Sequence, residues 1–152
     1  MNSNTATYQV QLELNLAADR QSVWKAVIED TTHWWRKDFY VGPAKAFLFE
    51  PKLGGRLFED WGEGAGVLWY TVIAIDPPNS IDLVGYLTPM WGGPAISMLR
   101  LELHENEAAT VLKVSDAILG PAKEQDADTK KEGWMLLFGQ GLKPYIESGR
   151  RA

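Results

Sequence analysis

The sequence predicts an α+β fold in which a curved, seven-stranded antiparallel sheet grips a long C-terminal helix. Three observations predict it: strands with alternating polarity, short turn-rich connections between them, and one long amphipathic segment at the end of the chain. The predicted order is one strand, two short helices, six strands and the long helix. A sheet with one apolar face must cover that face, and the last helix is the only element long enough to do so.

The first strand alternates strictly from Tyr8 to Leu16, with apolar side chains on one face and polar side chains on the other. Such alternation is typical of a strand with one face in water. Asp19 then offers an N-cap for a short helix that contains Val23 and Val27, and a second short helix should end at Trp35.

Six further strands are predicted, separated by turn signals such as Gly54-Gly55 and Pro77-Pro78. Because the connections are short, consecutive strands should pair antiparallel. Their ranges are 45–50, 56–61, 67–76, 81–87, 96–105 and 110–119.

The final amphipathic segment, from about residue 123 to residue 148, should form the gripping helix. Gly139, Gly141 and Pro144 should bend this helix. Because a straight helix cannot touch every part of a curved sheet, a pocket of about 300 to 1,000 Å³ should remain between the two.

The composition favours a single folded domain, residues 1–152 with a core from about 8 to 147. Apolar residues make up 45% of the chain and charged residues 23%, which is ordinary for a globular protein. The net charge of −5 and the lack of a basic stripe argue against nucleic-acid binding. The absence of cysteine excludes disulfides and thiolate metal sites, and it fits a reducing compartment.

The N-terminal sequence has neither the basic nor the apolar region of a secretory signal, and no window approaches the length of a membrane span. We therefore expect a cytoplasmic protein without a membrane partner.

The motifs of common catalytic sites are missing. The glycines of residues 62–66 precede a strand instead of a helix, which predicts a hairpin turn and argues against a phosphate-binding loop. No hydrolase elbow, zinc-binding helix or paired aspartate motif occurs, so no metal and no cofactor is expected. His104 should meet water, and His33 should lie near the mouth of the pocket as a capping or surface histidine, or as an acid or base.

Two carboxylates fall on the predicted inward face of the sheet. Asp116 follows Leu112 and Val114, and Glu59 shares a face with Leu57 and Trp61. Each is either a buried acid with a raised pKa or a carboxylate bound to backbone in a structural role, and the sequence leaves both alternatives open.

Aromatic residues give the strongest collective signal for a ligand site. The chain has seven Trp, five Phe and five Tyr, and large flat side chains often surround a pocket. The loop Thr88–Pro94 has a large apolar tip and glycine hinges, which is typical of a gate. The candidate ligand-binding residues are Trp34, Trp35, Phe39, Glu59, Trp61, Trp69, Tyr70, Tyr86, Met90, Trp91, Asp116, Trp134 and Phe138.

Local strings carry a resemblance to a known family. They are residues 23–26 (VWKA), 34–35 (WW), 49–51 (FEP), 54–56 (GGR), 67–69 (VLW), 74–78 (AIDPP), 133–134 (GW) and 142–146 (LKPYI). With the order of elements, they resemble the START-like, or SRPBCC, superfamily that includes plant pollen allergens and polyketide cyclases. More narrowly, the chain is similar to the bacterial branch named after the activator of the ninety-kilodalton heat-shock chaperone ATPase.

The resemblance implies a helix-grip fold over residues 8–147 and does not specify an activity. The superfamily includes ligand carriers, cyclases and self-sacrificing resistance proteins, without a shared catalytic motif. The chaperone activators pair this domain with another region, which is not expected of a chain of 152 residues.

These observations favour a binder of a small hydrophobic molecule, such as a polyketide, an aromatic compound or a lipid-like metabolite. One alternative is a cyclase or dehydratase that uses the same cavity, with a buried carboxylate or His33 moving a proton. The other is a homodimeric or co-chaperone-like interaction module, because the strand from Val67 to Ile75 is apolar on both faces.

Overall fold

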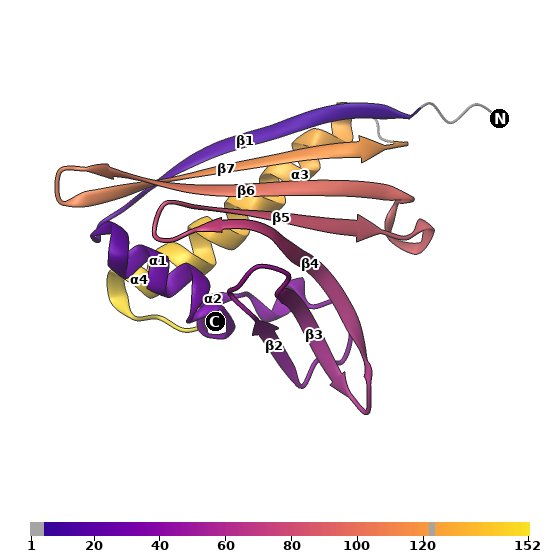
Figure 1. Ribbon diagram of the computed structural model, residues 1–152, viewed down its shortest axis with the longest axis horizontal. Coiled ribbons are helices and arrows are strands. Elements are labelled where there is room, and N and C mark those ends of the chain that lie inside the picture. Colours follow the sequence, from indigo (N-terminus) through magenta and orange to yellow (C-terminus); the bar gives the residue numbers. More distant parts are fainter. Residues whose placement is uncertain (1–4, 122–123) are drawn as a thin grey trace.

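The computed structural model describes residues 5–121 and 124–152 and has the predicted α+β helix-grip fold (Figure 1). One seven-stranded sheet has the order β1-β7-β6-β5-β4-β3-β2, and every neighbouring pair is antiparallel. The strands are β1 (Ala6–Leu16), β2 (Ala46–Phe49), β3 (Arg56–Gly62), β4 (Ala65–Asp76), β5 (Ser80–Leu87), β6 (Ala95–Asn106) and β7 (Ala109–Gly120).

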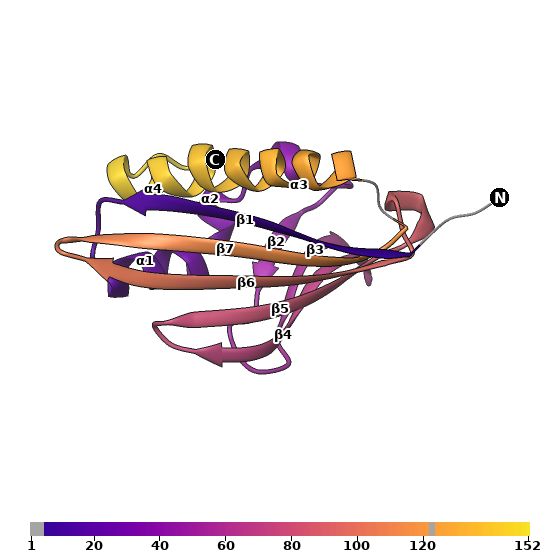
Figure 2. The ribbon, with the colours of Figure 1, turned by 90° about the horizontal axis from the view of Figure 1, so that it is seen from above.

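Helices cover one face of this sheet, as Figure 2 shows for the long C-terminal helix. The helical segments are α1 (Arg20–Ile28), α2 (Thr31–Trp34), η1 (Lys37–Phe39), η2 (Pro89–Trp91), α3 (Glu124–Leu137), η3 (Phe138–Leu142) and α4 (Lys143–Ser148). The last three run on directly from one another, and η3 is a π-helical turn that contains Gly139 and Gly141. Two of the residues predicted to bend the helix, Gly139 and Gly141, therefore lie in a local change of helix type.

The strand predictions hold to within two residues at each end. Helix α1 begins as expected, because the Asp19 side chain accepts a hydrogen bond from the Ser22 backbone N–H. Helix α2 ends one residue before the expected Trp35. The predicted start of the long helix at residue 123 lies outside the described residues.

The core lies between the sheet and the helices. On β7 the side chains of alternate residues from Thr110 to Ile118 are buried beneath the helices, which is the face that alternation predicts. Trp34, Leu137 and Phe138 close the core from the helical side. The opposite face of the sheet carries exposed side chains, including Lys113 of β7 and Met98 of β6.

A cavity beside the helix as the candidate functional site

Two adjoining compartments lie between the sheet and α3, near the first turns of that helix. Their volumes are about 410 Å³ and 230 Å³, and the larger falls within the predicted range. Five residues line both compartments and so form their common wall: Trp69, Leu87, Trp91, Lys130 and Trp134.

The cavity exists because β4 and β5 separate. Their ladder pairs Thr71 with Val84 and Asp76 with Ser80, but it stops at Thr71 although β4 extends back to Ala65. The part of β4 that has no partner in β5 stays paired with β3, and it bends away from β5 together with β3 and β2 (Figure 1). This separation opens the sheet beside Trp69 and Leu87, both of which line the two compartments.

A β-bulge aims two consecutive aromatic residues at this space. The register between β3 and β4 shifts from Leu57 opposite Tyr70 to Phe58 opposite Leu68, which leaves Trp69 as the extra residue. Without the bulge, Trp69 and Tyr70 would point to opposite faces of the sheet. With it, both residues line the smaller compartment.

The loop between β5 and β6 borders both compartments. Trp91 of η2 lines their walls and is partly exposed, whereas the neighbouring Met90 is almost fully exposed. Gly93 is required here, since a Cβ at this position would lie 1.8 Å from the Leu87 backbone oxygen. The predicted gate therefore presents one aromatic side chain, Trp91, to the cavity.

Helix α3 supplies the remaining wall. Lys130, Gly133 and Trp134 line the larger compartment, at the three- and four-residue spacing of one helix face. A Cβ at Gly133 would meet nothing within 4 Å, so the missing side chain leaves part of the space open.

Trp134 is fixed by a buried network. Its Nε1 donates to Asp116 Oδ2 at 2.9 Å, and Ser97 Oγ donates to Asp116 Oδ1 at 2.6 Å. Because Ser97 uses its proton on Asp116, the Tyr70 hydroxyl, 2.7 Å away, donates to Ser97. Burial, followed by the nearby Asp116 charge, raises the pKa of Tyr70, so its hydroxyl remains protonated as a donor.

Glu59 occupies a similar position behind the cavity wall. Its carboxylate accepts from Trp69 Nε1 at 2.7 Å, from Trp61 Nε1 at 3.1 Å and from the backbone N–H groups of Val41 and Gly42. All four partners are donors, which suits a carboxylate that only accepts. Neither Glu59 nor Asp116 lines either compartment. Both accept a hydrogen bond from a tryptophan N–H, but only Glu59 is also bound to backbone, as the structural alternative from the sequence required.

Polar groups gather at the rim of the larger compartment, where Tyr8, Asp126, Thr129 and Lys130 form part of the wall. Burial raises the pKa of Tyr8, and the charges of Asp126 and Asp116 raise it further. The cavity thus combines an apolar interior with a few polar groups, as ligand sites usually do.

The predicted ligand residues divide into two groups. Six line the cavity: Phe39, Trp69, Tyr70, Tyr86, Trp91 and Trp134. The others pack in the core, support the wall or point away: Trp34, Trp35, Glu59, Trp61, Met90, Asp116 and Phe138. Trp34 was expected to face the cavity. It lies inside the core instead, where its Nε1 donates to the Ala26 backbone oxygen.

Sequence reasoning missed Tyr8, Leu87, Lys130 and Gly133 as wall residues. Helical spacing could have found Lys130 and Gly133, which lie four and one positions before Trp134. Leu87 and Tyr8 carry no such signal, since each lies near the end of its strand and only the assembled sheet brings both to the cavity.

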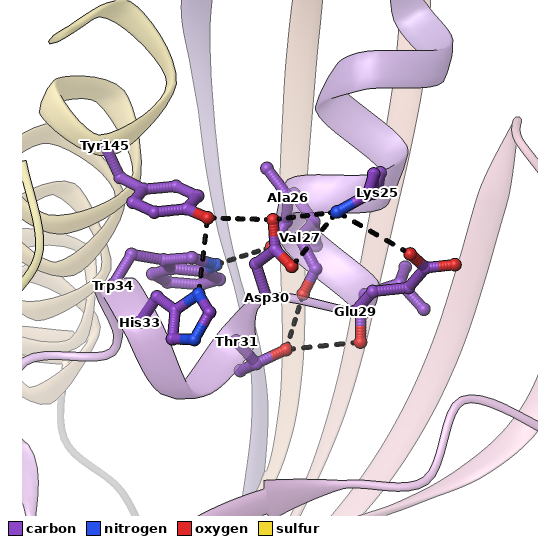
Figure 3. A network of polar contacts seen from close by, with 10 residues as sticks. Lys25, Ala26, Val27, Glu29, Asp30, Thr31, His33, Trp34 and Tyr145 are labelled. Atoms are coloured by element: carbon purple, nitrogen blue, oxygen red, sulfur yellow. Dashed lines mark hydrogen bonds and ion pairs between the residues drawn. The ribbon is translucent and has the colours of Figure 1, made fainter. Parts of the chain in front are cut away.

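His33 does not lie at the cavity mouth, contrary to expectation. Its Nδ1 is 3.3 Å from the Tyr145 hydroxyl, which donates to Asp30 Oδ2 at 2.8 Å (Figure 3). Tyr145 lies eleven residues after Trp134, or about 17 Å along a helix.

This cluster joins α4 to the segment between α1 and α2, and Lys25 also contacts Asp30 at 3.3 Å (Figure 3). Burial, followed by the bond to Asp30, raises the pKa of Tyr145, which keeps its donor proton in place. The cluster therefore holds α4 against the segment between α1 and α2.

His104, by contrast, is exposed beside Glu102, as expected.

Residues 5–121 and 124–152 contain no group of three or more His, Asp or Glu side chains placed to hold a metal ion. None of the helices in this part of the chain has the length and apolarity needed to cross a membrane.

The structure is a helix-grip fold with a cavity beside its long helix, and comparison with solved structures finds several with a similar fold. The chain superposes on DynU16, a protein of the dynemicin biosynthetic locus, with a TM-score of 0.68 and 20% identity over 93% of this chain and 48% of DynU16. CalU16 from Micromonospora echinospora gives 0.65 and 17% over 94% and 84% of the two chains.

The Aha1 dimer from Colwellia psychrerythraea gives a TM-score of 0.64 and 14% identity over 93% of this chain and 98% of Aha1. The present chain spans about half the length of DynU16. No family model and no curated protein matches the sequence. At these identities the similarity concerns the fold.

Proposed function

We propose that this protein binds a small hydrophobic molecule in the cavity between the sheet and α3. The observation that carries the proposal is the convergence of Trp69, Trp91 and Trp134 on the common wall of two adjoining compartments. Their volumes of about 410 Å³ and 230 Å³ suit a small ligand, and aromatic walls favour apolar or aromatic molecules. We propose a polyketide, an aromatic compound or a lipid-like metabolite.

The support of the wall fits a binding role. Trp69 and Trp134 are each held by a hydrogen bond to a buried carboxylate, so their rings are positioned before a ligand enters. A preformed wall lowers the ordering cost of binding. DynU16 belongs to the dynemicin biosynthetic locus, which agrees with a small-molecule role for this kind of fold. The bacterial branch related to the chaperone activator is the proposed family.

Gly133 offers a direct test. Gly133→Phe should place its ring in the larger compartment, because Gly133 lines that compartment and a Cβ there would meet nothing within 4 Å. The matched control is Gly139→Phe, since Gly139 is also unobstructed and does not line the cavity. The probe is N-phenyl-1-naphthylamine, an uncharged molecule whose fluorescence rises in apolar surroundings.

We expect the wild type and Gly139→Phe to bind the probe, and Gly133→Phe to bind it at least about tenfold more weakly. Equal binding by all three folded proteins, or binding by none, would contradict the proposal. Far-ultraviolet circular dichroism establishes that each variant is folded.

Analysis of the recovered compounds distinguishes an enzyme from a carrier. Asp116 and Glu59 lie behind the wall and line neither compartment, so neither is placed in direct contact with a ligand there. Mass spectrometry of small molecules recovered from the purified protein, before and after incubation with each candidate compound, decides the matter. Unchanged recovery supports a carrier, and conversion supports a cyclase or dehydratase.

We also propose that the chain forms a homodimer through the outer face of its sheet. Leu68, Tyr86, Met98 and Leu119 are large apolar side chains exposed on that face, and Leu68 and Tyr86 also line the smaller compartment at the gap between β4 and β5. Register places Tyr86 and Leu119 on the same side of the sheet, because Ile96 lies opposite both. The Aha1 structure from Colwellia psychrerythraea is a dimer, which supports this second proposal.

A further inference from the structure

Lys130 is the only cationic side chain on the described walls of the two compartments. It lines both of them, together with Trp69, Trp91 and Trp134. It lies one helical turn before Trp134 on the helix face that lines the cavity, and a lysine stem can follow an apolar wall while its ammonium stays near polar groups.

This ammonium has no ion-pair or hydrogen-bond partner in the described part of the chain. Lys25, Lys113 and Lys143 form ion pairs with Asp30, Glu13 and Glu147, and the other described lysines without an ion pair are exposed, whereas Lys130 is partly buried. Lys130 is a partly buried residue beside an apolar cavity, where an ammonium that loses hydration needs a polar partner in exchange. A ligand with a hydrogen-bond acceptor would supply the partner that the Lys130 ammonium lacks.

We propose that the ligand is an amphiphile with one anionic group, a carboxylate or a similar oxyanion, which accepts hydrogen bonds from Lys130 Nζ while its apolar body lies against Trp69, Trp91 and Trp134. This inference rests on the proposed function and specifies the ligand class. On a chain of net charge −5, Lys130 supplies the local positive charge that such a group requires.

Asp126 sets the orientation of this ligand. It lines only the larger compartment, one turn farther toward the start of α3, on the side of Tyr8. Its negative charge would repel an anion placed there, so the anionic group belongs at the common wall beside Lys130.

Two related fluorescent probes test the proposal. 8-Anilinonaphthalene-1-sulfonate carries a sulfonate, and N-phenyl-1-naphthylamine is the same aromatic amine without it. Lys130→Met keeps an apolar stem of similar length and removes the charge. Lys131→Met is the matched control, because Lys131 is exposed and lines neither compartment.

We expect Lys130→Met to weaken binding of the sulfonate probe about five- to tenfold and to change binding of the uncharged probe less than about twofold. Lys131→Met should change neither. Added salt should weaken sulfonate binding to the wild type and not to Lys130→Met. Lys130→Arg should retain most of the affinity for the sulfonate, which a purely structural role of the lysine would not predict.

The outcomes separate the two proposals. If both probes bind the wild type and Lys130→Met affects them equally, the anionic ligand is wrong and the cavity proposal stands. If neither probe binds the folded wild type, the cavity proposal itself fails. Thermal denaturation of Lys130→Met and Lys131→Met shows whether either change unfolds the chain.

Discussion

At the scale of single residues, Trp134 joins the cavity to the core. One part of its indole lines both compartments, and its Nε1 donates to the fully buried Asp116. A truncation therefore removes packing and also leaves a buried carboxylate with one donor fewer. The second effect is expensive, since an unsatisfied buried polar group costs about 1–3 kcal/mol.

Comparison of two tryptophan-to-phenylalanine variants isolates that hydrogen bond. Trp134→Phe loses the donor to Asp116, whereas the buried Trp35 Nε1 has no hydrogen-bond partner in the described residues. We expect Trp134→Phe to lower the free energy of unfolding by about 1–3 kcal/mol more than Trp35→Phe does. Urea denaturation measures both. Equal losses would show that the bond to Asp116 contributes nothing net.

The identity of the site residues could be predicted only in part. Alternation placed Asp116 and Glu59 on the inward face correctly, because strand periodicity is a local property. It could not show that each would meet a tryptophan N–H, since those donors come from distant strands and from α3. The bulge that turns Trp69 inward is likewise a property of two paired strands and is not visible in one.

At the scale of elements, the turn between β2 and β3 depends on an ion pair and a glycine. Glu50 Oε1 accepts from Arg56 Nε at 2.8 Å and from the Arg56 backbone N–H at 3.0 Å. The side-chain bond from Arg56, followed by the backbone bond, lowers the pKa of Glu50 from 4.5 to about 2. A Cβ at Gly55 would lie 1.9 Å from the Glu50 backbone oxygen, so only glycine fits there.

The pKa of Glu50 predicts a pH dependence of stability. Because its folded pKa is below its unfolded value, the ionised carboxylate stabilises the fold above pH 4.5, and this contribution is lost as the pH falls toward about 2. Arg56→Met should therefore flatten the fall of unfolding free energy over this range. Urea denaturation across the pH series measures it, with Glu132→Gln as an exposed control that should leave the slope unchanged. An unchanged slope in Arg56→Met would contradict the assignment.

Two glycines should respond in opposite directions to alanine. Gly133 lies inside α3 with free space at its Cβ position, so Gly133→Ala should stabilise the protein by about 0.5–1 kcal/mol through helix propensity. Gly55→Ala should destabilise it strongly, because the new methyl group meets backbone atoms that cannot move aside. Thermal denaturation of the two variants checks the signs. Destabilisation by Gly133→Ala would mean that the cavity wall is tighter than described.

At the scale of the whole molecule, the fold was predictable because its determinants repeat along the chain. Seven alternating strands with short connections define an antiparallel meander, and one long amphipathic helix must cover its apolar face. The position of the cavity was harder to predict. It depends on where the β4–β5 ladder ends, which no single segment encodes. His33 shows the same limit, since its partner Tyr145 lies 112 positions away in the sequence.

The outer face of the sheet carries large apolar side chains that could pack against a second copy of the chain. Leu68, Tyr86, Met98 and Leu119 are between 44% and 64% exposed, which is a high exposure for large apolar side chains that share one sheet face. A second copy of the chain would bury them against their equivalents, as symmetric dimers do. We therefore expect the wild type to form a dimer whose population rises with concentration.

Met98→Asp should raise the dissociation constant of this dimer about tenfold or more, because Met98 lies on the exposed face of β6 and two symmetry-related copies of the charge would be buried at one interface. Leu53→Asp is the matched control, since Leu53 is 70% exposed in the turn between β2 and β3 and lies outside the sheet face. Sedimentation equilibrium of the three proteins measures the constants. A wild type that stays monomeric throughout the concentration series would refute the dimer, and equal weakening by both variants would place the interface elsewhere.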